Sequence, residues 1–174
     1  MRRTSASLGT IAFFLLAPGI VAGVIPWWLT GWHVGQDWPA PLRLVGLVLV
    51  AASVIVLAEA FVRFVREGRG TPAPIAPTER LVVGGFYRYV RNPMYVAVLA
   101  TIVGEALALG SPVLLVYGLV VWVAFATFIR AYEEPHLAAR FGEGYLAYRT
   151  AVPAWLPRLH PWRPPEDDAQ GRSS

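Results

Sequence analysis

The sequence predicts an all-α integral membrane protein with about four transmembrane helices, the last two forming a short helical hairpin, and a C-terminal amphipathic helix. Apolar residues make up 56% of the 174 residues and charged residues 15%, whereas about 25% of an ordinary soluble domain is charged. One small soluble core could not bury so much apolar surface, which argues against a soluble domain and against a disordered chain. Cysteine is absent, so a disulfide framework, a zinc–thiolate site and a cysteine nucleophile are excluded.

The first predicted span is Leu8–Leu29, which contains no charged residue. Its length matches the roughly 20 helical residues that cross a bilayer. Pro18 and Gly19 lie in its middle, where a membrane helix tolerates them better than a soluble helix does. A cleaved signal peptide is the alternative, because two arginines precede the run and Ala22-Gly23 offers a cleavage site. The length of the run and the spans that follow favour a membrane helix.

The second predicted span is Leu44–Val62. Its single charged residue, Glu59, lies near the end and four residues before Arg63. Side chains at this spacing are neighbours on a helix surface, so we expect the two to pair at the membrane interface.

The third apolar block extends from residue 92 to residue 129 with one charge. As a single helix it would be about 57 Å long, far more than the ~30 Å hydrocarbon layer. The sequence Gly110-Ser111-Pro112 interrupts the block near its middle. We therefore expect two short spans, Pro93–Leu109 and Pro112–Arg130, joined by a tight turn.

The basic residues of the chain indicate its orientation in the membrane. All 15 are arginines, and most of them lie before the first span, between the second and third, and after the fourth, whereas the connections at residues 31–41 and at Ser111 contain none. The positive-inside rule places both termini and the long loop in the cytoplasm. Arginine without lysine suggests a bacterial source, hence an inner membrane. Topology explains the basic charge without a nucleic-acid partner.

The segment after the fourth span predicts a further helix at about residues 135–149. Leu137, Phe141, Tyr145 and Tyr148 recur at helical spacing, which is typical of an amphipathic helix on a membrane surface or against the protein itself. Residues 1–165 are interpreted as one membrane domain. Residues 166–174 are expected to be a disordered tail.

The segment from Glu79 to Tyr95, where the long loop enters the third span, is the richest in polar chemistry. It contains three tyrosines, three arginines, two adjacent glycines and a proline. An interfacial anchor is one interpretation, because tyrosine and arginine favour headgroup depth. A ligand pocket is the other, since Gly84-Gly85 allows close backbone approach and aromatic faces can hold a flat base or a cation. Composition alone leaves both open.

Acidic residues form the second group of candidates. The adjacent carboxylates Glu133 and Glu134 repel each other, so at least one is expected to meet a cation, either Arg130 or a ligand ammonium group. Glu105 lies inside the third span, where a carboxylate is costly, so it is either functional or neutral or paired within the bundle. The three histidines are scattered, so no metal site is expected.

These residues resemble a known superfamily. The stretch Tyr87-Arg88-Tyr89-Val90-Arg91-Asn92-Pro93-Met94-Tyr95, followed by Glu133-Glu134, Phe141-Gly142 and Val152-Pro153, is similar to the isoprenylcysteine carboxyl methyltransferases and phospholipid methyltransferases, over roughly residues 70–160. The resemblance implies an integral-membrane enzyme that uses S-adenosylmethionine and releases S-adenosylhomocysteine. It implies a lipophilic small-molecule acceptor, isoprenylcysteine-carboxylate-like or phospholipid-amine-like, with membrane lipid as a partner and no metal.

The resemblance also implies the site residues. The cofactor pocket would be formed by Leu81, Val82, Gly85, Tyr87, Arg91, Asn92, Pro93, Met94, Tyr95, Gly104, Glu133 and Glu134. Arg130 would assist substrate binding, as a nearby arginine does in some members. Asn92 stands where the family has histidine, which removes a possible base, and Glu105 is the best-placed candidate base for a hydroxyl or thiol acceptor.

Two other functions remain as alternatives. Sterol-type membrane reductases are distantly similar in the C-terminal part and would use NADPH, whose phosphates Arg88 and Arg91 could contact. A non-catalytic membrane scaffold would bind neither cofactor.

Overall fold

The computed structural model describes residues 17–68 and 81–163, and within them the chain is helical and contains no strand. The elements in order are the π-helix η1 (Ile20–Val24), α2 (Ile25–Thr30), α3 (Ala40–Gly68), the 3-10 helix η2 (Gly85–Arg88), α4 (Pro93–Leu109), α5 (Pro112–Phe128), the π-helix η3 (Ile129–Glu133) and α6 (Glu134–Ala151). The start of the first predicted span and the predicted disordered tail, residues 166–174, lie outside the described residues.

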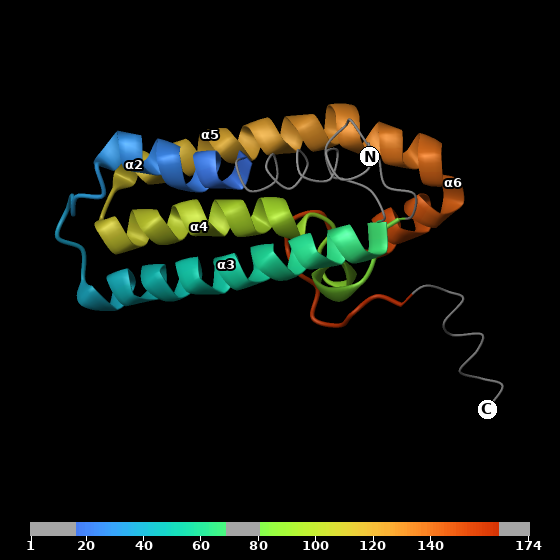
Figure 1. Cartoon of the computed structure of the whole chain (residues 1–174), viewed down its shortest axis with the longest axis horizontal. Coiled ribbons are helices and arrows are strands. Elements are labelled where there is room, and N and C mark those ends of the chain that lie inside the picture. The colour runs from blue at the N-terminus through green and yellow to red at the C-terminus, as the bar shows by residue number, and fades with distance from the viewer. Residues whose placement is uncertain (1–16, 69–80, 164–174) are drawn as a thin grey trace, which may run out of the picture.

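The long helices lie side by side in a bundle (Figure 1). Helix α4 is central, with α3 packed along one side and α5 along the other, and the helix formed by η1 and α2 lies beside α4 and α5. The α4–α5 pair is the predicted helical hairpin, and Gly110 at the turn has φ 63°. Backbone N–H groups of Gly35 and Gln36 donate to the carbonyls of Leu109 and Gly110 at 2.8 and 2.9 Å, which ties the 31–39 connection to this turn.

Two glycines allow the backbones of α3 and α4 to approach closely. A Cβ at Gly46 would lie 2.6 Å from the carbonyl oxygen of Gly104, and a Cβ at Gly104 would lie 2.8 Å from that of Gly46. Small residues in facing positions are how membrane helices pack, because lipid supplies no hydrophobic force between them. Gly104 therefore lies in the α3–α4 contact.

The outer faces of the bundle expose apolar side chains. Exposed residues include Leu44, Leu47, Val48, Val54 and Ile55 on α3, and Val113, Val116, Leu119, Val120 and Val123 on α5. Two helices are long and apolar enough to cross a membrane, one at Ala40–Arg63 and one beginning at Pro112, and Ala17–Thr30 and Pro93–Leu109 are shorter apolar helices. This surface is suited to lipid rather than water.

Helix α6 contains a sharp bend that a regular amphipathic helix would not have. Gly142 has φ 54° and ψ −130°, a region of backbone space essentially restricted to glycine. The chain therefore turns at this residue, and the second half of α6 returns toward the bundle (Figure 1). Tyr145, Tyr148 and Val152 then form a buried cluster with Leu81, Val83 and Trp162 around it.

Candidate active site

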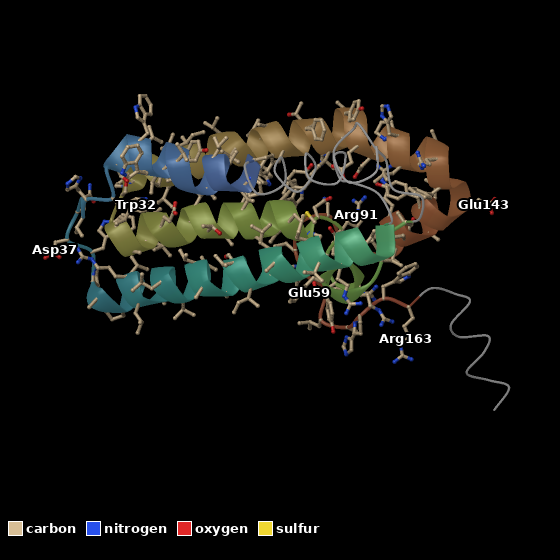
Figure 2. All side chains as sticks on the ribbon, in the orientation of Figure 1. Trp32, Asp37, Glu59, Arg91, Glu143 and Arg163 are labelled. Atoms are coloured by element: carbon tan, nitrogen blue, oxygen red, sulfur yellow. The ribbon has the colours of Figure 1, made fainter. Side chains whose placement is uncertain are left out.

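Polar residues from distant parts of the chain meet at one end of the bundle, between the start of α4, η3 and the second half of α6. Figure 2 shows Arg91 at this end and Asp37 at the other. Backbone hydrogen bonds of 2.9 Å hold the entry segment in place, from Arg91 N–H to Pro153 O, from Arg158 N–H to Tyr89 O and from Trp162 N–H to Arg88 O. The segment 88–91 is thus fixed before any ligand binds.

Glu134 is the centre of a buried ion-pair network. One of its carboxylate oxygens accepts from Arg91 Nη1 at 2.9 Å, and the other lies 3.0 Å from Arg149 Nη2. Tyr145 Oη lies 3.3 Å from Arg91 Nη1. The Glu134 side chain is only 10% exposed, so its two oxygens are committed to arginines and it is poorly placed to bind a ligand cation.

Glu133 has a different environment although it is the next residue. Its carboxylate accepts a hydrogen bond from Tyr95 Oη at 3.2 Å, and no arginine of the described residues forms an ion pair with it. Burial raises the pKa of the Glu133 carboxyl, against the hydrogen bond from Tyr95 and the nearby charge of Arg91, which lower it. A partly buried carboxylate without a cation partner would be stabilised in its ionised form by a nearby positive charge, so Glu133 is a candidate ligand-binding residue.

Arg91 retains unused hydrogen-bonding capacity. Its Nη1 is occupied by Glu134 and Tyr145, whereas its Nε is buried and has no hydrogen-bond partner among the described residues. A buried donor without an acceptor costs free energy, of the order of 1–3 kcal/mol. Arg91, with an unpaired donor, and Glu133, whose carboxylate has no cation partner among the described residues, therefore belong to one site.

Aromatic residues surround these charges. Tyr95 packs on Phe125 with ring centroids 4.7 Å apart. Tyr87 is buried, and its carbonyl accepts from Tyr148 Oη at 2.7 Å. Burial, with the nearby Tyr148 and Glu133, raises the pKa of the Tyr87 hydroxyl, so it stays protonated. Gly85, with φ 53°, lies so close to Glu59 and Arg63 of α3 that any side chain there would overlap them.

The remaining predicted residues of the entry segment have structural surroundings. Val82 and Met94 pack with Tyr87, and Leu81 packs against the Tyr145–Tyr148 cluster. The Asn92 side-chain amide donates to Ala154 O at 3.1 Å, which joins this segment to the C-terminal segment. Buried Pro93 begins α4.

Three predicted residues lie elsewhere. Glu105 is twelve residues along α4 from Pro93, about 18 Å at the helical rise of 1.5 Å per residue, and one of its carboxylate oxygens is buried without a partner in the described part of the chain. Gly104 contacts α3. Arg130 is exposed, and among the described residues it pairs with neither glutamate.

The carboxylates do not form a metal site with their neighbours. Within residues 17–68 and 81–163, no three His, Asp or Glu side chains gather closely enough to hold a metal ion.

Comparison with known proteins identifies the family to which these residues belong. A family model described as phospholipid methyltransferase matches residues 42–144, more than half of the chain. The chain belongs to the phospholipid methyltransferase family. The match extends from the start of α3 to the bend in α6, and so includes both Arg91 and the glutamate pair.

Several curated proteins with similar sequences are protein-S-isoprenylcysteine O-methyltransferases. The protein-S-isoprenylcysteine O-methyltransferase of Schizosaccharomyces pombe is 39% identical over 80 residues, covering 45% of this chain and 34% of that protein. Protein-S-isoprenylcysteine O-methyltransferase A of Arabidopsis thaliana is 30% identical over 136 residues, covering 75% and 60%. The human protein-S-isoprenylcysteine O-methyltransferase is 38% identical over 81 residues, covering 46% and 28%. No solved structure gives a significant match.

This phospholipid methyltransferase family member thus spans between about a quarter and 60% of the length of these curated relatives. Its membership confirms the resemblance seen in the sequence, and with the apolar helices it confirms an all-helical integral membrane protein.

Sequence reasoning missed the partners of Glu134. It considered Arg130, three residues earlier, whereas the structure pairs Glu134 with Arg91 and Arg149. The π-helix η3 and the bend at Gly142 bring these groups together. Short π-helical segments within α-helices are frequent at functional sites. The Phe141-Gly142 dipeptide was the signal available in the sequence, since glycine within a helical pattern often has a conformational reason.

Proposed function

We propose that the chain transfers a methyl group from S-adenosylmethionine to a lipophilic acceptor at the cytoplasmic face of the membrane. The observation that carries this proposal is that Arg91 Nε is buried without an acceptor, while the nearby Glu133 carboxylate accepts from Tyr95 and has no cation partner among the described residues. Family membership and the names of the relatives support methyl transfer.

The unused groups suit the amino-acid end of the cofactor, which carries an ammonium and a carboxylate. Glu133 would bind the ammonium group, and Arg91 would donate to the carboxylate. Glu134 would hold Arg91 in position without touching the cofactor, because its own oxygens already bind Arg91 and Arg149. Tyr87 and Tyr95 would offer aromatic faces to a positively charged centre.

The remaining predicted cofactor residues, Leu81, Val82, Gly85, Asn92, Pro93 and Met94, would shape this pocket. The cofactor supplies a methyl group on a positively charged sulfur, and the charge on sulfur is lost as the methyl leaves. The protein has to align the two reactants and exclude water. The tightly packed Tyr95–Phe125 and Tyr145–Tyr148 contacts serve water exclusion. A carboxylate acceptor requires no base, so neither Glu105 nor Arg130 is needed in this scheme.

The test is calorimetric titration of the detergent-purified protein with S-adenosylhomocysteine. We expect Glu133→Gln to weaken binding by about 1.5–3 kcal/mol, the value of a charge-assisted hydrogen bond, which is roughly tenfold to 100-fold. Arg130→Gln is the matched control and should leave affinity unchanged, because Arg130 is exposed and, among the described residues, pairs with neither glutamate. Unchanged affinity in Glu133→Gln, or stabilisation by NADPH in place of S-adenosylhomocysteine, would contradict the proposal.

A further inference from the structure

A row of three aromatic rings lies on the exposed side of the helix formed by α5, η3 and the first half of α6. Phe128 stacks on Tyr132 with ring centroids 5.2 Å apart, and Tyr132 packs on His136 with centroids 4.1 Å apart. Arg140 follows at the same four-residue spacing, and all four side chains are exposed. We call Phe128, Tyr132, His136 and Arg140 the aromatic–basic face.

The aromatic–basic face is on the outer side of η3, whereas the glutamate site is on the inner side. Glu133 and Glu134 follow Tyr132 directly in the chain. Their carboxylates bind Tyr95 and Arg91 within the bundle. Tyr132 is 40% exposed, whereas the Glu134 side chain is 10% exposed. A molecule on the aromatic–basic face therefore contacts the same short π-helix as the glutamate site without reaching the glutamates.

The aromatic–basic face lies at the depth where a spanning helix leaves the hydrocarbon layer. Val116 and Val120, nearer the start of α5, are exposed aliphatic side chains. At a rise of 1.5 Å per residue, Tyr132 is about 30 Å along the helix from Pro112, which is the thickness of the hydrocarbon core. His136, at about 36 Å, is then level with the lipid headgroups. The exposed side chains thus change from aliphatic to aromatic to basic as the surrounding lipid changes from acyl chains to headgroups.

The face offers two basic groups to an anion. His136 Nδ1 donates to Tyr132 O at 2.6 Å, since a carbonyl oxygen only accepts, and His136 Nε2 has no partner in the described part of the chain. An anionic oxygen at Nε2 would favour the imidazolium form, whose Nε2–H donates to it. Arg140 lies over the Phe141 ring, 5.8 Å from its centroid, and pairs with no carboxylate of the described residues. Glu143, three residues further on, lies beyond the bend in α6.

We propose that the aromatic–basic face is a docking surface for the headgroup of an anionic phospholipid. The phosphate accepts from His136 Nε2 and from the Arg140 guanidinium group, and the glycerol backbone and upper acyl chain lie against Phe128 and Tyr132. A free phosphate ion would use the two basic groups alone, so the rings at the hydrocarbon boundary favour a lipid. This lipid is not the methyl acceptor, because it binds outside η3. The inference therefore does not depend on the proposed reaction.

The test is native mass spectrometry of the detergent-purified chain, in which bound phosphatidylglycerol or phosphatidylcholine is measured against lipid concentration. We expect phosphatidylglycerol to bind more tightly, by about fivefold for each basic group, the effect of one basic side chain at an anionic membrane surface. His136→Phe keeps a ring in the row and removes both nitrogens, whereas Arg140→Gln removes the charge and leaves the rings in place. Each should lower phosphatidylglycerol affinity about fivefold and leave phosphatidylcholine binding unchanged.

Arg163→Gln is the matched control, because it removes the same charge from an exposed arginine elsewhere on the bundle. Figure 2 shows Arg163 beyond α3, on the side of the bundle away from α5. This variant should bind phosphatidylglycerol as the unmodified chain does. An equal loss in Arg163→Gln would overturn the proposal, because the lipid would then respond to the net charge of the chain and not to the aromatic–basic face.

Three other results would also overturn the proposal. These are equal affinity for the two lipids, unchanged affinity in both His136→Phe and Arg140→Gln, and displacement of phosphatidylglycerol by an equal concentration of sn-glycerol 3-phosphate, which would make the phosphate alone the ligand. Thermal unfolding in the same detergent shows whether the variants are folded. Arg140→Gln retains the hydrogen bond between His136 and Tyr132, so the comparison holds even where His136→Phe does not fold.

Discussion

Glu133 and Glu134 are neighbours in the chain with different surroundings. Glu134 binds two arginines, and Glu133 binds a tyrosine hydroxyl and no arginine of the described chain. Glu134 therefore connects parts of the site that are distant in sequence, whereas Glu133 is the residue that we propose for ligand binding. Substitutions at the two positions should separate stability from binding.

Glu134→Gln should destabilise the fold. The change leaves Arg91, 12% exposed, without its counter-charge, and breaking a buried ion pair costs ~3–5 kcal/mol. We expect about 3 kcal/mol, the lower end of that range, because Arg149 is partly exposed. Thermal unfolding in detergent measures the loss, with Glu133→Gln as the matched control. Equal melting temperatures for the two variants would show that Glu134 is not the structural member of the pair.

Cofactor affinity should depend on pH through Glu133. Burial holds the pKa of this carboxyl above its ordinary value in the free protein, and only the ionised form attracts an ammonium group. Affinity for S-adenosylhomocysteine should therefore be complete above that pKa and decline as pH falls through it, starting at a higher pH than an exposed glutamate would give. Titrations between about pH 5 and 7 should show this decline in the unmodified chain and a flatter profile in Glu133→Gln.

At the scale of elements, the bend in α6 matters most to the site. It returns Tyr145, Tyr148 and Arg149 to the entry segment, where Tyr145 and Arg149 join the network around Glu134. A straight helix would carry these residues away from the bundle. The bend depends on one glycine with a backbone conformation that other residues avoid.

Gly142→Ala should cost about 1–3 kcal/mol, the typical strain of a non-glycine residue in this region of backbone space. Open space surrounds the residue, so the cost is conformational and not steric crowding. Gly144→Ala is the matched control, since Gly144 is two residues away within the helical part and equally unobstructed; alanine there should be neutral or stabilise by up to ~1 kcal/mol. Unfolding midpoints in the opposite order would contradict the role of the bend.

At the scale of the whole molecule, the bundle has two unlike ends. The glutamate site, η2, α6 and the C-terminal segment occupy one end, and the 31–39 connection with the α4–α5 turn occupies the other (Figure 2). Exposed Trp27, Trp28 and Trp32 cluster in sequence near the second end, as residues of an aromatic belt do. From the arginine distribution we predict that the end with the glutamate site faces the cytoplasm.

Single cysteines test this orientation cleanly, because the chain has none of its own. Asp37→Cys and Glu143→Cys place thiols at opposite ends of the bundle, and both side chains are exposed. In intact cells a membrane-impermeant maleimide should label Asp37→Cys, whereas Glu143→Cys should react only after permeabilisation. The reverse pattern would put the proposed cofactor site on the wrong side for a cytoplasmic methyl donor.

Fold class and family could be predicted from the sequence because they depend on local properties. The length of an apolar run and the interruption at Gly110-Ser111-Pro112 can each be read from a short stretch of chain. The motif Arg91-Asn92-Pro93-Met94-Tyr95 with Glu133-Glu134 pointed to the methyltransferases, which the family match confirms. The residues of the cofactor site stay a prediction, although the structure brings Arg91, Tyr95 and both glutamates together.

Only the tertiary structure showed that Glu134 pairs with two arginines, whereas Glu133 binds a tyrosine hydroxyl. Helical spacing says which residues share a face only while the helix is regular, and here the π-turn at η3 and the bend at Gly142 both break that regularity. Arg91 is 43 residues before Glu134, so no local pattern could pair them. Gly104, which resembled a cofactor glycine, lies against Gly46 of α3. This contact could not be predicted from the sequence around Gly104, because a close approach between two helices depends on the residues of both helices.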